Sequence, residues 1–342
     1  MKENRPLKVL IIAPSWIGDA VLSHSLIQNL KINHPEIIID VGANNWTSDI
    51  YRRMPEVINI IELPTRHGKL GLLGILKKAK EIKKLNYDQA YILPRSIKSA
   101  LIPFFSGIKK RTGFLGEKRY GILNDIRSFD PKRLDQTIKR FHALAGNHSD
   151  GAFNLFQPKL IANKERGMEI LESHGLDATK RFIALAPGAE YGKSKMWPTK
   201  YFNELGLLIE KNDFNIYVFG SPKEQVLSEK ILKGLNHDRC FSFAGKTSLI
   251  ESIDILSLAK SMVTNDSGLM HLGASVGVPV VAIYGSTSPE FTPPMTDQKS
   301  IHWLNIECSP CFKRECAFGH YECLNSIKPD VILNSLQNLI RS

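Results

Sequence analysis

The sequence SMVTNDSGLMHLGASVGVPVVAIYGSTSPEFTPP occupies residues 261–294 and predicts a strand, a tight turn, a helix and a second strand. The turn, residues 265–268, precedes a helix predicted over residues 269–276. The first backbone N–H groups of a helix have no partner within it, and the macrodipole adds partial positive charge there. The turn therefore favours an anion such as a diphosphate. Alternatively, Asp266 or Ser267 is an ordinary N-cap of that helix.

A second loop rich in hydrogen-bond donors follows the strand predicted over residues 280–284. Residues 285–288, Gly-Ser-Thr-Ser, offer backbone N–H groups and hydroxyls. Ligands of open α/β sheets bind beyond the carboxyl ends of the strands. The two loops side by side therefore predict a cradle for phosphate groups.

Strands and helices alternate along the whole chain, which predicts an α/β fold with two parallel sheets. The apolar run KVLIIA, residues 8–13, is typical of a strand buried on both faces. The periodicity lapses around Gln157-Pro158, which we interpret as a linker. We therefore expect two Rossmann-like domains, residues 1–157 and 165–328, and a last helix, residues 329–342, that packs back on the first domain.

The composition of the 342 residues is that of a globular protein, with 43% hydrophobic and 23% charged residues. No apolar run reaches the roughly 18 residues that a membrane-spanning helix needs. The first residues lead into a strand rather than a signal peptide. We therefore expect a soluble, cytoplasmic protein.

The excess of positive charge lies entirely in the N-terminal half. Residues 1–157 hold 25 Lys and Arg against 14 Asp and Glu, a net of +11, and the remaining residues hold 20 of each. This asymmetry predicts contact with nucleic acid, an anionic membrane surface or a phosphorylated substrate. A solvated basic face that aids solubility is the alternative.

Two segments carry much of this charge. The helix predicted over residues 70–85 is apolar on one side and rich in Lys on the rest, which suits either an anionic membrane surface or an ordinary surface helix. Residues 108–125, IKKRTGFLGEKRYGILND, interleave Arg and Lys with Phe114 and Tyr120. Arg forks bind phosphates or carboxylates, and rings stack on sugars. The segment could equally be a solvated connection.

Several chemically active side chains lie in the loops that follow predicted strands, where a ligand of such a sheet would bind. They are Asp19, Arg95, Lys195, Glu224, Asp266 and Ser286. No Gly-x-Gly-x-x-Gly follows the first strand, and no Gly-x-x-x-x-Gly-Lys-Ser/Thr occurs. A standard dinucleotide enzyme or P-loop NTPase is therefore disfavoured.

Five segments occur in a specific order along the chain: PSWIGDAVLSHSL (14–26), LPRSIKSALIPFFSGIKKRTGFLGEKRYGILND (93–125), PGAEYGKSKMWP (187–198), FGSPKE (219–224) and VTNDSGLMHLGASVGVPVVAIYGSTSPEFTPP (263–294). In combination they resemble glycosyltransferase family 9, the lipopolysaccharide heptosyltransferases. The resemblance implies a GT-B fold, in which two Rossmann-like domains face an interdomain cleft. It also implies an ADP-heptose donor held by the C-terminal domain, a lipid-linked acceptor held by the N-terminal one, and transfer with inversion and without a metal or cofactor.

The resemblance also implies roles for single residues. Asp19 matches the family's catalytic base, which takes the proton from the acceptor hydroxyl as that hydroxyl attacks the anomeric carbon; the alternative is an N-cap of the following helix. Lys195 matches the diphosphate-binding Lys, and Met196 stands where many members carry Arg, for which Lys193 is the candidate substitute. Glu224 matches a position that contacts the ribose. The expected donor-binding residues are Lys195, Glu224, Asp266, Ser267, Gly268, His271 and Ser286, although each could be a cap or a surface residue.

The basic half suits an acceptor that carries Kdo carboxylates and lipid A phosphates. The expected acceptor-binding residues are Arg95, Lys98, Arg111, Lys118 and Arg119. We expect a monomer that binds no nucleic acid and associates, in a salt-sensitive way, with the inner face of the cytoplasmic membrane.

The PSWIGD loop and GSPKE favour the enzyme that adds the second heptose of the inner core, to heptosyl-Kdo2-lipid A. Addition of the first heptose, to Kdo2-lipid A, is the alternative. A basic nucleic-acid-binding protein and a catalytically silent nucleotide-sugar binder are further hypotheses, and the intact Asp19 argues against the second of these.

Four cysteines lie close together near the C-terminal end: Cys308, Cys311, Cys316 and Cys323. Such a set could hold zinc or an iron–sulfur cluster, remain as reduced thiols or form a disulfide. Its spacing is not that of a standard zinc ribbon. The fifth cysteine, Cys240, lies apart from them.

Overall fold

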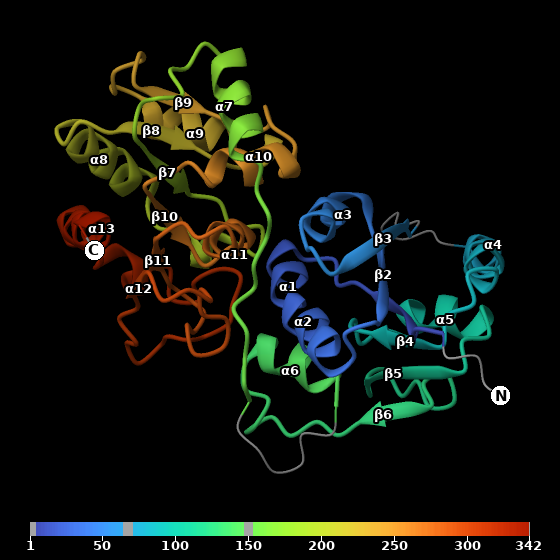
Figure 1. Cartoon of the computed structure of the whole chain (residues 1–342). Coiled ribbons are helices and arrows are strands. Elements are labelled where there is room, and N and C mark those ends of the chain that lie inside the picture. The colour runs from blue at the N-terminus through green and yellow to red at the C-terminus, as the bar shows by residue number, and fades with distance from the viewer. Residues whose placement is uncertain (1–4, 64–70, 147–152, 342) are drawn as a thin grey trace. The chain divides into compact units, whose positions relative to one another are not determined.

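The computed structural model describes residues 5–63, 71–146 and 153–341 (Figure 1). The chain divides into two compact units, Met1–Pro158 and Lys159–Ser342. In the described part of each unit the strands form one six-stranded sheet, and all paired strands are parallel. The predicted α/β class with two parallel sheets is confirmed.

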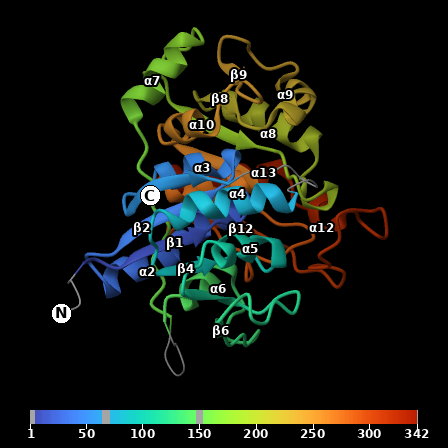
Figure 2. The same cartoon turned by 90° about the vertical axis from the view of Figure 1, so that its right-hand side faces the viewer.

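The first unit has the strand order β3-β2-β1-β4-β5-β6, the doubly wound order of Rossmann folds. Helices α4 and α5 pack together on one face of this sheet and lie in front of the strands in Figure 2, and α1, α2, α3 and α6 pack on the other. The elements are β1 (Lys8–Ile12), α1 (Ile17–Leu22), α2 (His24–Asn33), β2 (Ile38–Ala43), α3 (Asn45–Arg52), β3 (Val57–Glu62), α4 (Leu72–Lys83), β4 (Gln89–Ile92), α5 (Ile97–Phe105), β5 (Lys110–Phe114), β6 (Asp125–Arg127) and α6 (Thr137–Ala143).

Strand β1 lies at the centre of this sheet and is buried on both faces, as its unbroken apolar run predicts. Leu10 and Ile12 pack in the core under α4 and α5. The basic helix predicted over residues 70–85 corresponds to α4, and residue 70 lies outside the described residues.

The second unit repeats the same order, β12-β11-β10-β7-β8-β9. Its elements are α7 (Lys164–Ser173), β7 (Phe182–Ala186), the short 3-10 helix η1 (Lys193–Lys195), α8 (Thr199–Glu210), β8 (Asn215–Val218), the 3-10 helix η2 (Pro222–Glu224), α9 (Gln225–Leu232), β9 (Cys240–Ser242), α10 (Leu249–Leu256), β10 (Ser261–Asn265), α11 (Gly268–Ser275), β11 (Val280–Ile283), β12 (Lys299–His302), α12 (Glu322–Asn325) and α13 (Pro329–Arg341).

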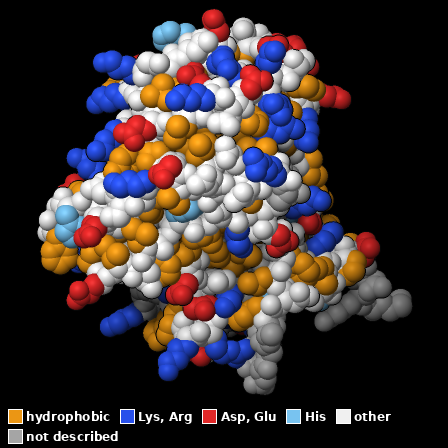
Figure 3. Space-filling model, turned by 90° about the vertical axis from the view of Figure 1, so that its left-hand side faces the viewer, with side chains coloured by type: hydrophobic (Ala, Val, Ile, Leu, Met, Phe, Trp, Pro, Cys, Tyr) orange, Lys and Arg blue, Asp and Glu red, His pale blue; other side chains and the backbone are white. Residues whose placement is uncertain are grey.

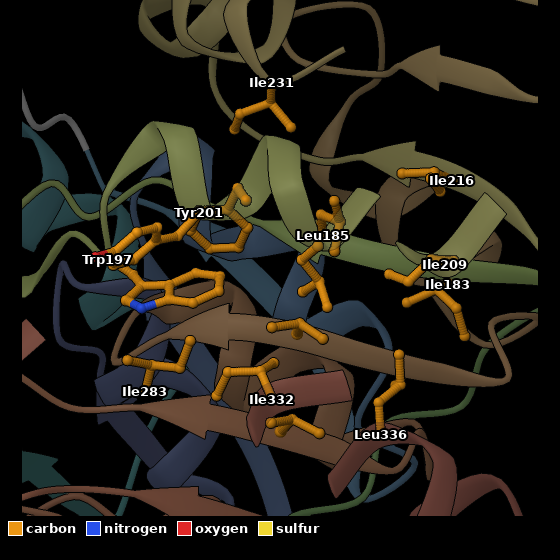
Figure 4. Close-up of a cluster of buried hydrophobic side chains, with 14 of the residues drawn as sticks. Ile183, Leu185, Trp197, Tyr201, Ile209, Ile216, Ile231, Ile283, Ile332 and Leu336 are labelled. Atoms are coloured by element: carbon orange, nitrogen blue, oxygen red, sulfur yellow. The ribbon is translucent and has the colours of Figure 1, made fainter. Parts of the chain in front are cut away.

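Alternate residues of β7 supply two cores on opposite faces of the second sheet. Ile183 and Leu185 point into a cluster with Trp197 and the helices α8 and α13 (Figure 4). Phe182 and Ala184 point into the other cluster, with α7 and α10. Both faces of the strand are therefore covered.

The packing of the last helix, α13, differs from the prediction. Ile332 and Leu336 of α13 are buried in the core that also holds Ile183 and Leu185, and α13 contacts α8, β10, β11 and β12 (Figure 4). The prediction that residues 329–342 pack back on the first domain is therefore wrong for the described residues. The periodicity of a helix identifies its apolar face but not the sheet against which that face packs.

No helix among the described residues is long and apolar enough to cross a membrane. On the face shown in Figure 3, Lys and Arg side chains are interspersed with Asp, Glu and hydrophobic ones. The positive charge on this face is thus spread rather than gathered into one continuous patch.

The burial of α13 in the second unit can be tested by mutation. Leu336→Ala removes buried methyl groups, and we expect a loss of about 2–5 kcal/mol in the free energy of unfolding of the second unit. Val331→Ala on the same helix, where the side chain is 46% exposed, should cost less than about 1 kcal/mol. Urea denaturation followed by circular dichroism gives both values. Equal losses in the two variants would contradict this packing.

Candidate active site

Three loops of the second unit meet where the neighbouring strands β7, β10 and β11 end. They comprise residues 187–198, 265–268 and 285–288. Ser286 joins the first loop to the third, since its backbone N–H donates to the carbonyl of Ser194 at 3.0 Å and the two hydroxyls lie 2.9 Å apart. Two of the loops at this strand end are thus bound directly to each other.

Asn265, the last residue of β10, holds both ends of the longest of these loops. Its side chain is fully buried; Nδ2 donates to the carbonyl of Pro187 at 2.6 Å, and Oδ1 accepts from the backbone N–H of Trp197 at 3.0 Å. The buried Trp197 ring in turn donates from Nε1 to the carbonyl of Ile327 at 2.9 Å. The loop that carries Lys195 is therefore fixed at both ends.

Lys195 and Asp266, both predicted as site residues, form a largely buried ion pair. Lys195 Nζ lies 2.6 Å from Asp266 Oδ2, and Thr287 Oγ1 donates to the same oxygen at 2.6 Å. The sequence prediction did not include Thr287, although its loop was identified as rich in hydroxyls. The three side chains come from three loops and form one hydrogen-bonded cluster, neutral overall, at the edge of the sheet.

The N-terminus of α11 adjoins this pair. Ser267 occupies the N-cap position, but its side chain makes no capping hydrogen bond, and the carboxylate of Asp266 is directed to Lys195 and Thr287. The alternative of an ordinary side-chain cap therefore does not hold here. The first N–H groups of the helix, including that of Gly268, remain available to an anion.

His271 lies one turn into α11 and is buried. Burial lowers its pKa to about 4; the charge of Asp266 opposes this shift and that of Lys195 adds to it. Its Nδ1 is buried and has no hydrogen-bond partner among the described residues. His271 is therefore neutral at pH 7, with one ring nitrogen unpaired.

Two other predicted donor residues already have internal partners. The Ser286 hydroxyl is buried against Ser194. The Glu224 carboxylate accepts from the backbone N–H of Ser221 in a capping box, and a Cβ on Gly188 would lie 1.5 Å from Glu224 Oε1. Glu224 therefore acts as a helix cap, as the alternative interpretation predicts. Its carboxylate also contacts the loop after β7.

In the first unit, Asp19 is the half-buried third residue of α1, which follows β1. Trp16 occupies the N-cap position, so the alternative that Asp19 caps this helix is wrong. Burial lowers the pKa of Arg140, the charge of Arg95 lowers it further, and Asp135 and Asp19 oppose the shift. Asp19 therefore lies within electrostatic reach of the Arg140 guanidinium.

Arg95 and Arg140 share one aromatic ring. The Cζ atoms of Arg95 and Arg140 lie 4.1 Å and 5.3 Å from the centroid of Phe129, and that of Arg95 lies 5.6 Å from Phe114. Such rings help to hold guanidinium groups in place, and Arg140 Nε also donates to the carbonyl of Leu134 at 2.8 Å. No local pattern in the sequence marks Arg140, since it lies on α6, outside the basic segments.

Two of the predicted acceptor residues brace the backbone instead. Arg119 is 1% exposed and donates to the carbonyls of Ser96 and Phe114, both at 2.9 Å. Arg111 donates to the carbonyls of Ile122 and Ile108, both at 2.6 Å. The other three predicted residues, Arg95, Lys98 and Lys118, are exposed.

All five cysteines are free thiols. Burial raises the pKa of Cys323 to about 11, and the neighbouring Cys308, Cys311 and Cys316 add to the shift. The four clustered thiols are therefore close in space. In the part of the chain that the structure describes, no group of three or more His, Cys, Asp or Glu side chains is placed to hold a metal ion.

The family model of glycosyltransferase family 9 (heptosyltransferase) matches residues 75–322. The chain belongs to glycosyltransferase family 9. It is 36% identical over 343 residues to lipopolysaccharide heptosyltransferase 2 of Escherichia coli. The alignment covers 98% of this chain and 99% of that protein. The solved structure of E. coli ADP-heptose lps heptosyltransferase II matches with a TM-score of 0.88 and 34% identity, covering 98% of this chain and 99% of that one. Lipopolysaccharide heptosyltransferase 1 of Pseudomonas aeruginosa is 22% identical, over 91% of this chain and 88% of its own.

These similarities confirm the GT-B architecture and the assignment as a glycosyltransferase. The hypothesis of a basic nucleic-acid-binding protein is less supported, since the matching family is one of glycosyltransferases. The chain is thus a sugar-transferring enzyme.

The buried His271 predicts how stability depends on pH. Between its ordinary pKa of 6.5 and about 4, the unfolded chain binds a proton at this side chain that the folded protein does not. The free energy of unfolding should therefore fall as the pH falls through this window, by up to about 1.4 kcal/mol per pH unit from His271. Urea denaturation at several pH values should give a shallower slope for His271→Gln.

His237→Gln, a change at an exposed His of the same unit, is the matched control and should keep the slope of the parent protein. Parallel slopes for the parent protein and His271→Gln would show that His271 is not held neutral.

Proposed function

We propose that this chain transfers heptose from ADP-L-glycero-D-manno-heptose to the first heptose of heptosyl-Kdo2-lipid A, with inversion and without a metal ion. The proposal is supported by the nearly full-length similarity to heptosyltransferase 2 relatives. The observation that carries the mechanism is the Lys195–Asp266 pair beside the uncapped start of α11. Addition of the first heptose is the alternative, and the lower similarity to a heptosyltransferase 1 disfavours it.

The second unit, which we take as the donor domain of residues 165–328, would bind ADP-heptose. Lys195 and the N–H groups at Ser267 and Gly268 suit the diphosphate, because they offer one positive charge and several donors at a helix N-terminus. The same groups would stabilise the charge that develops on ADP as it leaves. Asp266 would keep Lys195 in position and accept hydrogen bonds from heptose hydroxyls, and Glu224 would contact the ribose.

Asp19 of the first unit, residues 1–157, would act as the general base. Its carboxylate accepts the proton of the acceptor hydroxyl while that oxygen bonds to the anomeric carbon and the bond from this carbon to the ADP oxygen breaks. Attack from the face opposite the leaving group inverts the anomeric centre. The cationic groups around Lys195 take the role that a metal ion has in other transferases, so we expect no metal requirement.

The acceptor would bind to the first unit through its acidic groups. Arg95 and Arg140, held on the Phe129 ring near Asp19, suit a Kdo carboxylate or a lipid A phosphate, and the exposed Lys98 and Lys118 add positive charge. We infer that the enzyme is a cytoplasmic monomer that meets its lipid-linked acceptor at the inner face of the cytoplasmic membrane.

The reaction is tested by transfer from ADP-heptose, in the presence of EDTA, to acceptors that carry Kdo alone or Kdo and one heptose. The parent protein should transfer only to the heptose-bearing acceptor. Asp19→Asn should lower kcat by about 100-fold or more, because the base is lost, and should leave the affinity for ADP unchanged.

Asp49→Asn, a change to a surface carboxylate on α3 that pairs with Arg52, is the matched control and should keep full activity. Transfer to the Kdo-only acceptor would instead identify the first-heptose enzyme. A loss of activity in EDTA that a divalent metal restores would contradict the metal-free mechanism.

The acceptor site is tested separately. Arg140→Gln and Arg95→Gln should each raise the KM for the acceptor by about 10-fold, since each removes a charged hydrogen bond to an acidic group. The KM for ADP-heptose should not change. Arg52→Gln, an exposed charge on α3, is the control. An unchanged acceptor KM in both variants would remove these residues from the acceptor site.

A further inference from the structure

The segment between β12 and α12, which carries three of the clustered cysteines, lies directly against the donor loops. Phe312 donates from its backbone N–H to the carbonyl of Ser286 at 2.7 Å and accepts from the Tyr191 hydroxyl at 2.6 Å. Ser194 donates from its hydroxyl to the carbonyl of Lys313. The segment is therefore bound to two of the three loops that form the candidate donor site.

The backbone of Arg314 is fixed at the same place. Its carbonyl accepts from the backbone N–H of Ser194 at 3.2 Å. A Cβ on Gly192 would lie 2.3 Å from that carbonyl oxygen, so the close approach requires glycine, which also suits the φ of 154° there. The backbone of Arg314, from which its side chain extends, is thus fixed next to η1, the 3-10 helix that carries Lys195.

The Arg314 side chain returns to this site. Its Cζ lies 5.5 Å from the centroid of the Tyr191 ring, and Lys195 Nζ lies 5.1 Å from the same centroid. The two positive groups are therefore at most about 11 Å apart. Tyr191 is itself held by the bond from its hydroxyl to Phe312, so the ring is a common platform for both cations.

The two cations differ in their partners. Lys195 is paired with Asp266 at 2.6 Å, which offsets its charge. Among the described residues, no carboxylate forms an ion pair with Arg314. Met196, directly after Lys195, is apolar and adds no charge. Arg314 is therefore an exposed guanidinium beside the Tyr191 ring, and no carboxylate of the described residues offsets its charge through an ion pair.

We propose that Arg314 is a second cation of the donor site and binds the phosphate oxygens of the nucleoside diphosphate beside Lys195. A guanidinium presents paired N–H donors that match two phosphate oxygens, which a single ammonium cannot do. Arg314 also stabilises the charge on the departing diphosphate. The inference rests on the proposed function, since it assumes that ADP-heptose is the donor.

The test measures binding of ADP and of AMP to the full-length protein by isothermal titration calorimetry. Arg314→Gln should weaken ADP binding by about 10-fold, because a charged hydrogen-bonding partner is lost, and weaken AMP binding much less. Lys313→Gln removes the same charge from the adjacent residue and should leave both affinities near those of the parent protein. Arg314→Lys should recover part of the loss.

Each alternative outcome is distinct. An Arg314→Gln variant that binds ADP like the parent protein, while the parent transfers heptose, overturns this inference and leaves the proposed function standing. An equal loss for ADP and AMP together with a lowered melting temperature identifies Arg314 as a structural brace and also overturns it. A parent protein that does not bind ADP overturns both proposals.

Discussion

The donor loops depend on the two hydrogen bonds that the Asn265 side chain makes. A buried amide is costly unless its hydrogen bonds are made. Here both ends of the amide are used, one on the carbonyl of Pro187 and one on the N–H of Trp197. Since β10 lies beside β7 in the sheet, this amide fixes a loop of the neighbouring strand to the end of its own strand. The positions of Lys195 and Tyr191 follow from that constraint.

Charge is treated differently in the two units. In the second unit, the Lys195–Asp266 pair is nearly buried and neutral overall, and it adjoins helix N–H groups that an anion can use. In the first unit, Arg95 and Arg140 are held by an aromatic ring near a half-buried carboxylate. The arrangement in the second unit suits a diphosphate leaving group, on which negative charge develops. The arrangement in the first unit suits an acidic acceptor bound next to a general base.

Several residues that look functional in the sequence are used to hold the backbone. Arg111 and Arg119 donate to carbonyls of their own segment, and the hydroxyl of Ser286 bridges two loops. Arg140 also donates to a carbonyl, that of Leu134, and its guanidinium shares the Phe129 ring with Arg95. Residue type alone does not distinguish these roles, because the partners of an Arg side chain depend on the path of other segments.

Patterns within the sequence were enough to predict the α/β class, the strands that are buried on both faces, the positions of Asp19, Lys195 and Asp266 after strands, and the family. These features follow from short-range periodicity and from motifs of fixed spacing, which a single chain displays directly. Three features emerged from the folded structure alone: the sheet that α13 covers, the bond from Thr287 to Asp266, and the ring that Arg314 shares with Lys195. These contacts join residues that are far apart in the chain, and the packing of whole elements sets the distances between them.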